Sequence, residues 1–181
     1  MNAIRMIFST FALLLPGIAW PGPIPETQDS AMGFRSFDLP AVQTGTFELS
    51  FDATPLADRI DVFTGIAAKA PGAAAEVSAI VRFNDSGTID VRNGGAFRAD
   101  QVLGYSANKV YRVRMVVNVA GNTYSVFVTP PGQPEVPLAS NYAFRTQRSA
   151  VQSLATLVLA GFKGSNGFFT GAHRVSGVTL K

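Results

Sequence analysis

The chain contains no cysteine among its 181 residues. This absence excludes disulfide bonds and thiolate metal sites. There is one tryptophan, Trp20, and one histidine, His173. With no second histidine and no cysteine, the usual ligand set of a transition-metal site is missing. The position of His173 just before the last expected strand, beside Arg174, favours a surface or turn residue over a general base.

Charge is also scarce. Charged residues make up 15% of the chain and the formal net charge is +3, which is too small to indicate nucleic-acid binding. Runs of Leu, Glu, Lys and Ala at helical spacing are missing, whereas Phe is abundant with 14 residues and Val, Thr and Gly recur throughout. This composition favours β-structure. A chain of this length with 47% hydrophobic residues suits one globular domain.

The clearest alternation of apolar and polar residues lies between Tyr105 and Thr129, and it predicts a long hairpin in the middle of a sheet. Gly121-Asn122 is expected to supply its turn, because both residues tolerate positive φ. Further strands are expected at 34–39, ended by Pro40, and at 44–53, 60–66, 77–83, 88–91, 154–160 and 175–180. A Gly-rich loop is expected at 93–103. About ten strands without a helix pattern predict an all-β, antiparallel two-sheet sandwich.

The first residues have the pattern of an export signal. Residues 1–19 begin with a charge at Arg5, continue through an apolar centre and end with small residues at Gly17 and Ala19, which predicts a signal peptide cut after Ala19. The apolar run is too short for a permanent membrane span. Residues 20–32 are expected to be a Pro-rich polar leader, and 33–181 the single domain. We therefore expect a secreted or periplasmic protein without membrane insertion, and the lack of cysteine indicates a bacterial one.

Several segments between Thr44 and Leu180 resemble a known family. They are TGTFELSFDATP, IDVFTGI, AIVRFNDSGTIDVRNGG, KVYRVRMVVNVAGNTYSVFVTPPG and RVSGVTL. On these segments the chain resembles the concanavalin A-like lectin and glucanase superfamily, and within it the laminin-G-like bacterial domains. The resemblance implies a jelly roll of two stacked antiparallel sheets, whose concave sheet commonly holds a carbohydrate. It therefore implies a lectin-like domain that binds an extracellular or cell-wall polysaccharide, although these motifs concern fold more than activity.

The alternation separates a core face from a polar face rich in arginine. The expected core residues are Phe47, Leu49, Phe51, Val81, Phe83, Ile89, Val91, Tyr111, Val113, Met115 and Val117. The candidate ligand-binding residues are Glu48, Arg82, Arg92, Arg112, Arg114 and Asn118 on the polar face, with Tyr105 and Tyr142 as stacking platforms near loops. Arg112 and Arg114 share one side of a strand and can bind a carboxylate or sulfate bidentately. The alternative is that these arginines face solvent and pair with Asp90 and Glu48 across the sheet. Further aromatic candidates are Phe97, Phe168 and Phe169.

Catalysis is not favoured by the sequence. Glucanase-type members of the superfamily place two Glu around an Asp on one strand, whereas Glu26, Glu48, Glu76 and Glu135 are isolated here. The lyase-type members use a Gln-x-His pair, and no Gln precedes His173 at that spacing. A polysaccharide lyase or glycoside hydrolase is therefore the third hypothesis, after a lectin-like domain and a structural or protein-interaction domain.

We expect no cofactor, and one alternative about metals stays open. Asn84, Asp85 and Asp90 provide hard oxygen ligands of the kind that calcium prefers. The run Asn84-Asp85-Ser86-Gly87 is also typical of a turn between two strands, and the turn explanation is favoured.

Overall fold

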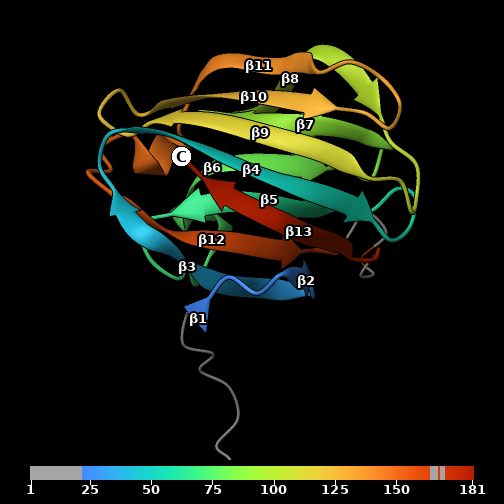
Figure 1. Ribbon diagram of the computed structural model, residues 1–181, viewed down its shortest axis with the longest axis horizontal. Helices are drawn as coiled ribbons and strands as arrows, with labels where there is room; N and C mark the ends of the chain where they lie inside the picture. The colour runs from blue at the N-terminus through green and yellow to red at the C-terminus, as the bar shows by residue number, and fades with distance from the viewer. Residues whose placement is uncertain (1–21, 164–166, 168–169) are drawn as a thin grey trace, which may run out of the picture.

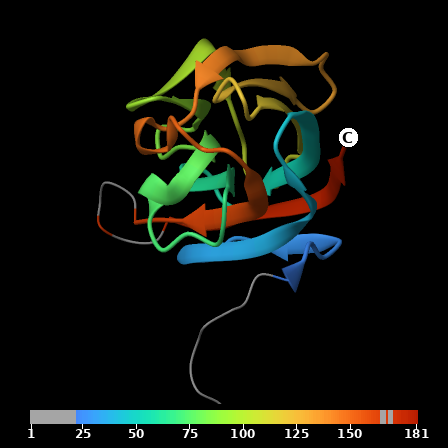
Figure 2. The same ribbon diagram turned by 90° about the vertical axis from the view of Figure 1, so that its left-hand side faces the viewer.

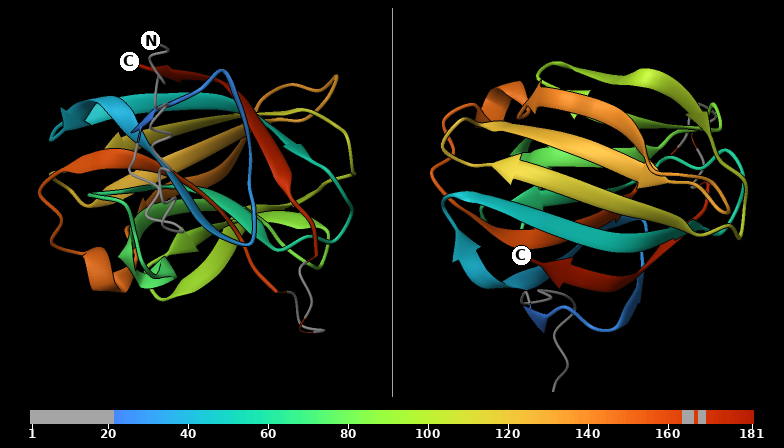
Figure 3. Two further views of the ribbon diagram at one scale, coloured as in Figure 1. Left: turned by 90° about the horizontal axis from the view of Figure 1, so that it is seen from below. Right: turned by 45° about the horizontal axis from the view of Figure 1, so that its top comes forward.

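The computed structural model describes residues 22–163, 167 and 170–181. The expected signal peptide, Trp20, Phe168 and Phe169 lie outside these residues. The described chain forms two stacked β-sheets, and the six-stranded sheet lies in front of the seven-stranded sheet in Figure 1 and in the right view of Figure 3. No helix in this part of the chain has the length and hydropathy needed to cross a bilayer.

The order of strands in the seven-stranded sheet is β1 (Gly22–Pro23), β3 (Gly33–Gln43), β12 (Leu154–Gly161), β5 (Val62–Ala67), β6 (Val77–Phe83), β7 (Thr88–Asn93) and β8 (Ala96–Gly104). The order in the six-stranded sheet is β11 (Val136–Ala143), β10 (Thr123–Thr129), β9 (Tyr111–Asn118), β4 (Thr46–Pro55), β13 (His173–Leu180) and β2 (Thr27–Asp29). The short β1–β3 pairing is parallel, and the strands that form the body of both sheets pair antiparallel. This is the predicted two-sheet sandwich.

The predicted hairpin is confirmed as β9 and β10, which lie inside the six-stranded sheet between β4 and β11. Strand β9 alternates buried and partly exposed residues along nearly its whole length, because successive side chains of a strand point to opposite faces. The turn is longer than the two residues predicted, since Asn122 donates its N–H to the carbonyl of Val119 at 3.0 Å. Asn122 has a φ of 52°, which is the left-handed conformation that asparagine tolerates.

The space between the sheets is the main core. All eleven residues predicted to fill it are buried: Phe47, Leu49, Phe51, Val81, Phe83, Ile89, Val91, Tyr111, Val113, Met115 and Val117. The prediction succeeds because a period of two fixes which side chains face inward once a strand is identified.

Four local predictions differ from the structure. The segment 93–103, predicted as a loop, contains β8, and β11 was not predicted at all. Both strands lie at the end of a sheet, where a strand buries few side chains and its alternation is weak. Strand β3 continues through Pro40 and lies between β1 and β12, so it is neither ended by the proline nor an edge strand. The expected leader 20–32 contributes β2, which pairs with β13.

Candidate functional site

The predicted arginine-rich wall is divided between the two outer faces of the sandwich. Arg82 and Arg92 lie on β6 and β7 of the seven-stranded sheet, whereas Arg112 and Arg114 lie on β9 of the six-stranded sheet. These faces point in opposite directions, so one ligand site cannot include both pairs. The prediction of a single wall is wrong because alternation distinguishes inward from outward residues but does not assign a strand to a sheet.

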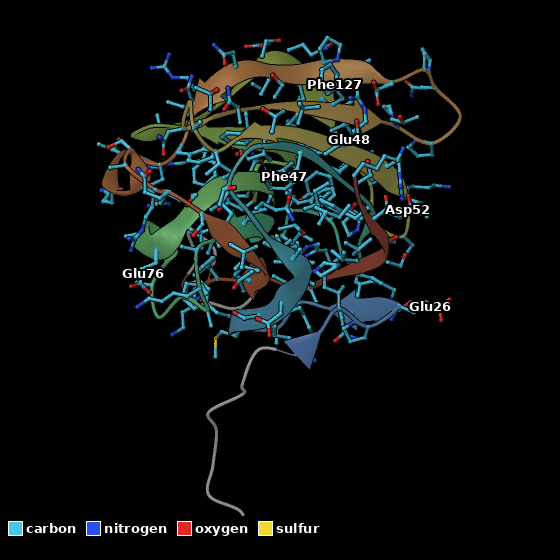
Figure 4. All side chains as sticks on the ribbon, turned by 60° about the vertical axis from the view of Figure 1, so that its left-hand side comes forward. Glu26, Phe47, Glu48, Asp52, Glu76 and Phe127 are labelled. Carbon is cyan, nitrogen blue, oxygen red and sulfur yellow. The ribbon has the colours of Figure 1, made fainter. Side chains whose placement is uncertain are left out.

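On the six-stranded sheet, Arg114 is held by two carboxylates of this chain. Its Nε and Nη2 donate to Glu135 at 3.0 and 2.7 Å, and its Nη1 donates to Glu48 at 3.3 Å. The guanidinium also lies 4.0 Å from the ring centroid of Phe127. The hydrogen bond from Arg114 lowers the pKa of Glu135. Figure 4 shows Glu48 and Phe127 on this side of the molecule, with Glu76 on the opposite side.

The other predicted residues of this face are also engaged within the chain. Arg112 donates to Asp52 and to the carbonyl of Gly177, both at 3.2 Å, and the side-chain oxygen of Asn118 accepts the N–H of Gly121 at 2.9 Å. Pairing of the β9 arginines with carboxylates is therefore confirmed, and Glu48 is one of the predicted partners. Asp90, the other predicted partner, lies on the opposite sheet.

The two tyrosines predicted as stacking platforms are buried. The hydroxyl of Tyr105 accepts the N–H of Ile60 and donates to the carbonyl of Asn84, both at 2.8 Å. The hydroxyl of Tyr142 donates to Asp100 at 2.7 Å. Burial is the largest cause that raises the pKa of each tyrosine to about 12. Tyr105 and Tyr142 are 8% and 7% exposed, respectively, so neither presents a face on which a sugar can stack.

The predicted calcium ligands form a hydrogen-bonded turn. The side-chain oxygen of Asn84 accepts the N–H groups of Ser86 and Thr88 at 3.0 and 3.1 Å, and its amide nitrogen donates to Asp90 at 2.9 Å. Both oxygens of Asp90 also accept from Arg82, and Asp85 lies within the same turn. The part of the chain that the structure describes holds no group of three or more His, Asp or Glu residues arranged to bind a metal.

His173 lies in the core, and the prediction of a surface or turn position is wrong. It is fully buried at the start of β13. Its Nδ1 lies 2.9 Å from the hydroxyl of Ser30, and its Nε2 lies 2.8 Å from the hydroxyl of Thr64 on β5. Burial lowers the pKa of His173 to about 3. The neutral imidazole therefore links the two sheets, and the sequence offered no signal for this role.

The outer face of the seven-stranded sheet is apolar at its centre. A second buried cluster lies there, formed by Phe63, Ala67, Val77, Ile80, Val158 and Ala160. All residues of β5 and nearly all of β12 are buried, because these central strands are covered on both faces. The covering includes the segments around the two 3₁₀ turns, η1 (Ala74–Glu76) and η2 (Thr146–Arg148), which Figure 2 shows on the side away from the C-terminal strand. A Glu76–Arg148 ion pair at 3.6 Å joins them.

A pocket of about 170 Å³ opens on this face. It is lined by Asp61, Phe63, Ala74, Arg82, Phe97, Arg145 and Phe162. These residues come from β5, β6, β8, η1 and three connecting segments. Two residues named from the sequence as candidates for ligand binding line it, Arg82 and Phe97. We call this space the arginine-phenylalanine pocket.

Aromatic rings form one part of the pocket wall. The ring centroids of Phe63 and Phe162 lie 5.4 Å apart, and Phe34 lies 5.8 Å from Phe162. The backbone N–H of Phe162 donates to the carbonyl of Asp61 at 2.9 Å. The ring of Phe162 is therefore positioned by packing and by the backbone, and it remains partly exposed at the pocket.

Arg82 forms the charged part of the wall. Its Nε and Nη2 donate to the two oxygens of Asp90 at 2.8 and 2.7 Å, and its Nη1 lies 3.5 Å from Asp61. Its guanidinium lies 3.7 Å from the ring centroid of Phe97. Burial raises the pKa of Asp61, against the attraction of Arg82. Three contacts hold Arg82, so its orientation is fixed before any ligand arrives.

Arg145 completes the pocket from the segment between β11 and η2. Its backbone N–H donates to the carbonyl of Ser78 at 2.9 Å. Its side-chain Nε is buried and has no hydrogen-bond partner among the residues that the structure describes. Burial, together with the nearby positive charge of Arg92, lowers the pKa of Arg145.

A larger pocket of about 600 Å³ lies elsewhere, lined by residues of β3, β4, β13 and the connection between β1 and β2. Its lining is mostly apolar, with Glu26 and Asp38 as its charged residues among Ile24, Pro25, Leu39, Pro40, Leu49, Gly177, Val178 and Leu180. The larger volume of this pocket does not by itself make it a ligand-binding site. The arginine-phenylalanine pocket is the stronger candidate site because aromatic rings and hydrogen-bond donors converge there.

Comparison with known proteins gives one curated relative and several similar structures. No family model matches the chain. A gellan lyase from Bacillus sp. is 36% identical over 110 residues, which cover 59% of this chain and 4% of that enzyme. The chain thus corresponds to a small part of that relative.

Solved structures with a similar fold include a sialidase, a lectin and a β-glucanase. A sialidase aligns with a TM-score of 0.55 and 14% identity over 86% of this chain and 15% of its own. Lectin I-B4 from Griffonia simplicifolia aligns with a TM-score of 0.53 and 11% identity, over 82% of this chain and 80% of its own. A GH131 β-glucanase catalytic domain from Podospora anserina aligns with a TM-score of 0.53 and 10% identity, over 86% of this chain and 70% of its own. Together with the sheet topology, these likenesses establish that the chain has the concanavalin A-like lectin and glucanase fold.

Proposed function

We propose that this protein is a non-catalytic carbohydrate-binding domain, and that a sugar of an extracellular polysaccharide occupies the arginine-phenylalanine pocket. The observation that carries the proposal is the convergence of Phe97 and Phe162 with charged groups around one pocket on the outer face of the seven-stranded sheet. Sugar rings have apolar faces that pack on aromatic rings and hydroxyl groups that need hydrogen-bond partners. The relative named as a gellan lyase supports a polysaccharide as the ligand class.

The size of the pocket suits a local contact with a polysaccharide. Its volume of about 170 Å³ is below the roughly 300–1,000 Å³ of pockets that enclose a drug-sized ligand. It therefore accommodates one sugar unit, while the rest of the polymer lies over the neighbouring surface. The non-catalytic role is supported by the pocket lining, because Asp61 is the one carboxylate among the described residues that line it, whereas hydrolysis of a glycosidic bond uses a pair of carboxylates.

The test is a binding screen of the purified protein against soluble polysaccharides, including gellan, with calcium and with chelator. We expect saturable binding to one class of polysaccharide. Phe162→Ala should weaken it by up to about tenfold, because an aromatic contact is worth about 0.5–1.5 kcal/mol beyond its buried area. Phe127→Ala is the matched control, because Phe127 also contacts an arginine but lies on the six-stranded sheet.

Three outcomes would contradict the proposal. No binding by folded protein to any polysaccharide would favour the structural or protein-interaction domain. Binding that is insensitive to Phe162→Ala but lost on combined Arg112→Ala and Arg114→Ala substitution would move the site to the six-stranded sheet. Cleavage of the polysaccharide during the assay would show that the domain is an enzyme.

A polysaccharide ligand fits a protein that acts outside the cytoplasm. We therefore propose that residues 1–19 are removed as a signal peptide and that the remaining chain folds as one domain. N-terminal sequencing of protein recovered from the medium or periplasm should begin at Trp20. Intact Met1 on exported protein would refute the cleavage.

A further inference from the structure

The arginines of the sandwich differ in whether the chain itself neutralises them. Five of them form ion pairs with carboxylates: Arg82, Arg112, Arg114, Arg148 and Arg174. Arg35, Arg59 and Arg98 are exposed to solvent. Arg92 and Arg145 are partly buried and have no ion pair among the described residues. A partly buried guanidinium without a counter-charge is costly, since its desolvation is not repaid by a neighbouring carboxylate.

The two unpaired arginines lie at the same place. Arg92 donates to the backbone carbonyls of Gly94 and Gly95 at 2.9 and 2.7 Å. Gly94 in turn exchanges backbone hydrogen bonds with Ala143 and Thr146 on either side of Arg145. The backbone therefore holds the two segments together, and the positive charge of Arg92 acts on Arg145.

The donors of the two arginines are not equally occupied. Arg92 uses two of its donors on carbonyl oxygens, whereas the buried Nε of Arg145 has no partner among the described residues. Arg145 also lines the pocket beside Phe162. Asp61, the carboxylate among the described lining residues, pairs with Arg82, as does Asp90, and neither forms an ion pair with Arg145.

We propose that the saccharide bound in the arginine-phenylalanine pocket is acidic, and that the guanidinium of Arg145 binds its carboxylate or sulfate. This inference rests on the proposed function and names the class of sugar. A guanidinium donates two parallel hydrogen bonds to such a group. Phe97 and Phe162 contact the ring of the sugar, while Arg92 adds positive charge next to Arg145. The lowered pKa of Arg145 agrees with a cation that lacks a counter-ion until ligand binds.

The test compares acidic polysaccharides with neutral forms of the same backbone. The probes are pectate with methyl-esterified pectin, alginate with carboxyl-reduced alginate, and heparin with desulfated heparin. We expect an acidic probe to bind at least about tenfold more tightly than its neutral form, because a hydrogen bond to a charged group is worth more than one between neutral groups. Rising salt concentration should weaken the binding of the acidic probe more than the binding of the neutral one.

The variants are Arg145→Gln and, as a matched control, Arg174→Gln. Arg145→Gln should remove the preference for the acidic probe and leave the thermal midpoint near that of the unsubstituted protein, since the buried Nε of Arg145 has no hydrogen-bond partner among the described residues to lose. Arg174 pairs with Asp29 at the edge of the six-stranded sheet, so Arg174→Gln should keep the preference.

The failures of the two proposals can be told apart. Equal binding of acidic and neutral probes, or a preference that survives Arg145→Gln, would overturn the acidic-saccharide inference. The proposed function would still stand if Phe162→Ala weakened that binding. No binding of any probe or of any polysaccharide in the wider screen would overturn both.

Discussion

Acidification should destabilise this domain through His173. The imidazole is fully buried between the sheets and is hydrogen-bonded to Ser30 and Thr64. Asp29 is the charged group whose field favours protonation of His173, but burial outweighs it and lowers the pKa to about 3. In the unfolded chain the pKa of a histidine is about 6.5. The unfolded state therefore takes up a proton first as the pH falls.

The size of the effect follows from the two pKa values. Because the folded-state pKa is lowered, the contribution of His173 to stability is fully present above about pH 6.5 and is lost as the pH falls toward about 3. At about pH 5 the loss is about 2 kcal/mol. That is a large part of a typical free energy of unfolding of about 5–15 kcal/mol.

The assay is urea unfolding at several pH values from about 7 down to about 5. This window avoids the carboxylates Asp29, Glu76 and Glu135, whose pKa values are lowered from ordinary values near 4. Burial raises the pKa of Asp61, but Asp61 is present in both proteins compared, so the difference between their profiles reports His173. His173→Gln is the comparison variant. It should be less stable than the unsubstituted protein at neutral pH, yet show little further loss down to about pH 5.

The reasoning would be refuted by a flat stability profile in the unsubstituted protein over this range. If the free energy of unfolding of His173→Gln fell equally steeply with pH, another group would be responsible for the pH dependence. A direct measurement of the His173 ring by NMR should find it neutral at about pH 5, in line with its lowered pKa.

Three smaller predictions concern stability and can be checked by chemical or thermal denaturation. Gly65→Ala should cost about 1–3 kcal/mol, since the new Cβ would lie 2.6 Å from a side-chain carbon of Val77, whereas Gly45→Ala, with no atom within 4 Å, should be nearly neutral. Tyr124→Phe should cost about 1–3 kcal/mol, because its buried hydroxyl accepts the N–H of Ile80 on β6 and donates to the carbonyl of the same residue, both at 3.1 Å. Arg112→Ala should cost less than about 1 kcal/mol, because its ion pair is partly exposed. A neutral Gly65→Ala or Tyr124→Phe, or a costly Arg112→Ala, would contradict the contact geometry.

The sequence by itself determined the strands with clear alternation and the side chains that face the core. Val113, Met115 and Val117 were assigned correctly because a strand has a period of two, and a local pattern is enough to read it. The segment resemblance also led to the correct fold, since alternating strands and turns are features of the fold rather than of a ligand.

The edges of the sheets were decided by tertiary structure. Strands β8 and β11 lie at sheet ends, where hydrogen bonds to one neighbouring strand replace the burial that would produce alternation. The pairing of Arg82 with Asp90 and of Arg114 with Glu135 likewise depends on which strands become neighbours.

The candidate site was almost entirely a product of tertiary structure. Asp61, Phe97, Arg145 and Phe162 are far apart in the sequence and meet only because their strands and connections share one outer face. Burial of His173 has the same origin, because a polar residue is assigned to the surface until the sheets that enclose it are known. Local periodicity thus determined inside and outside along each strand, and the packing of the two sheets decided which outward residues lie together and can act on one ligand.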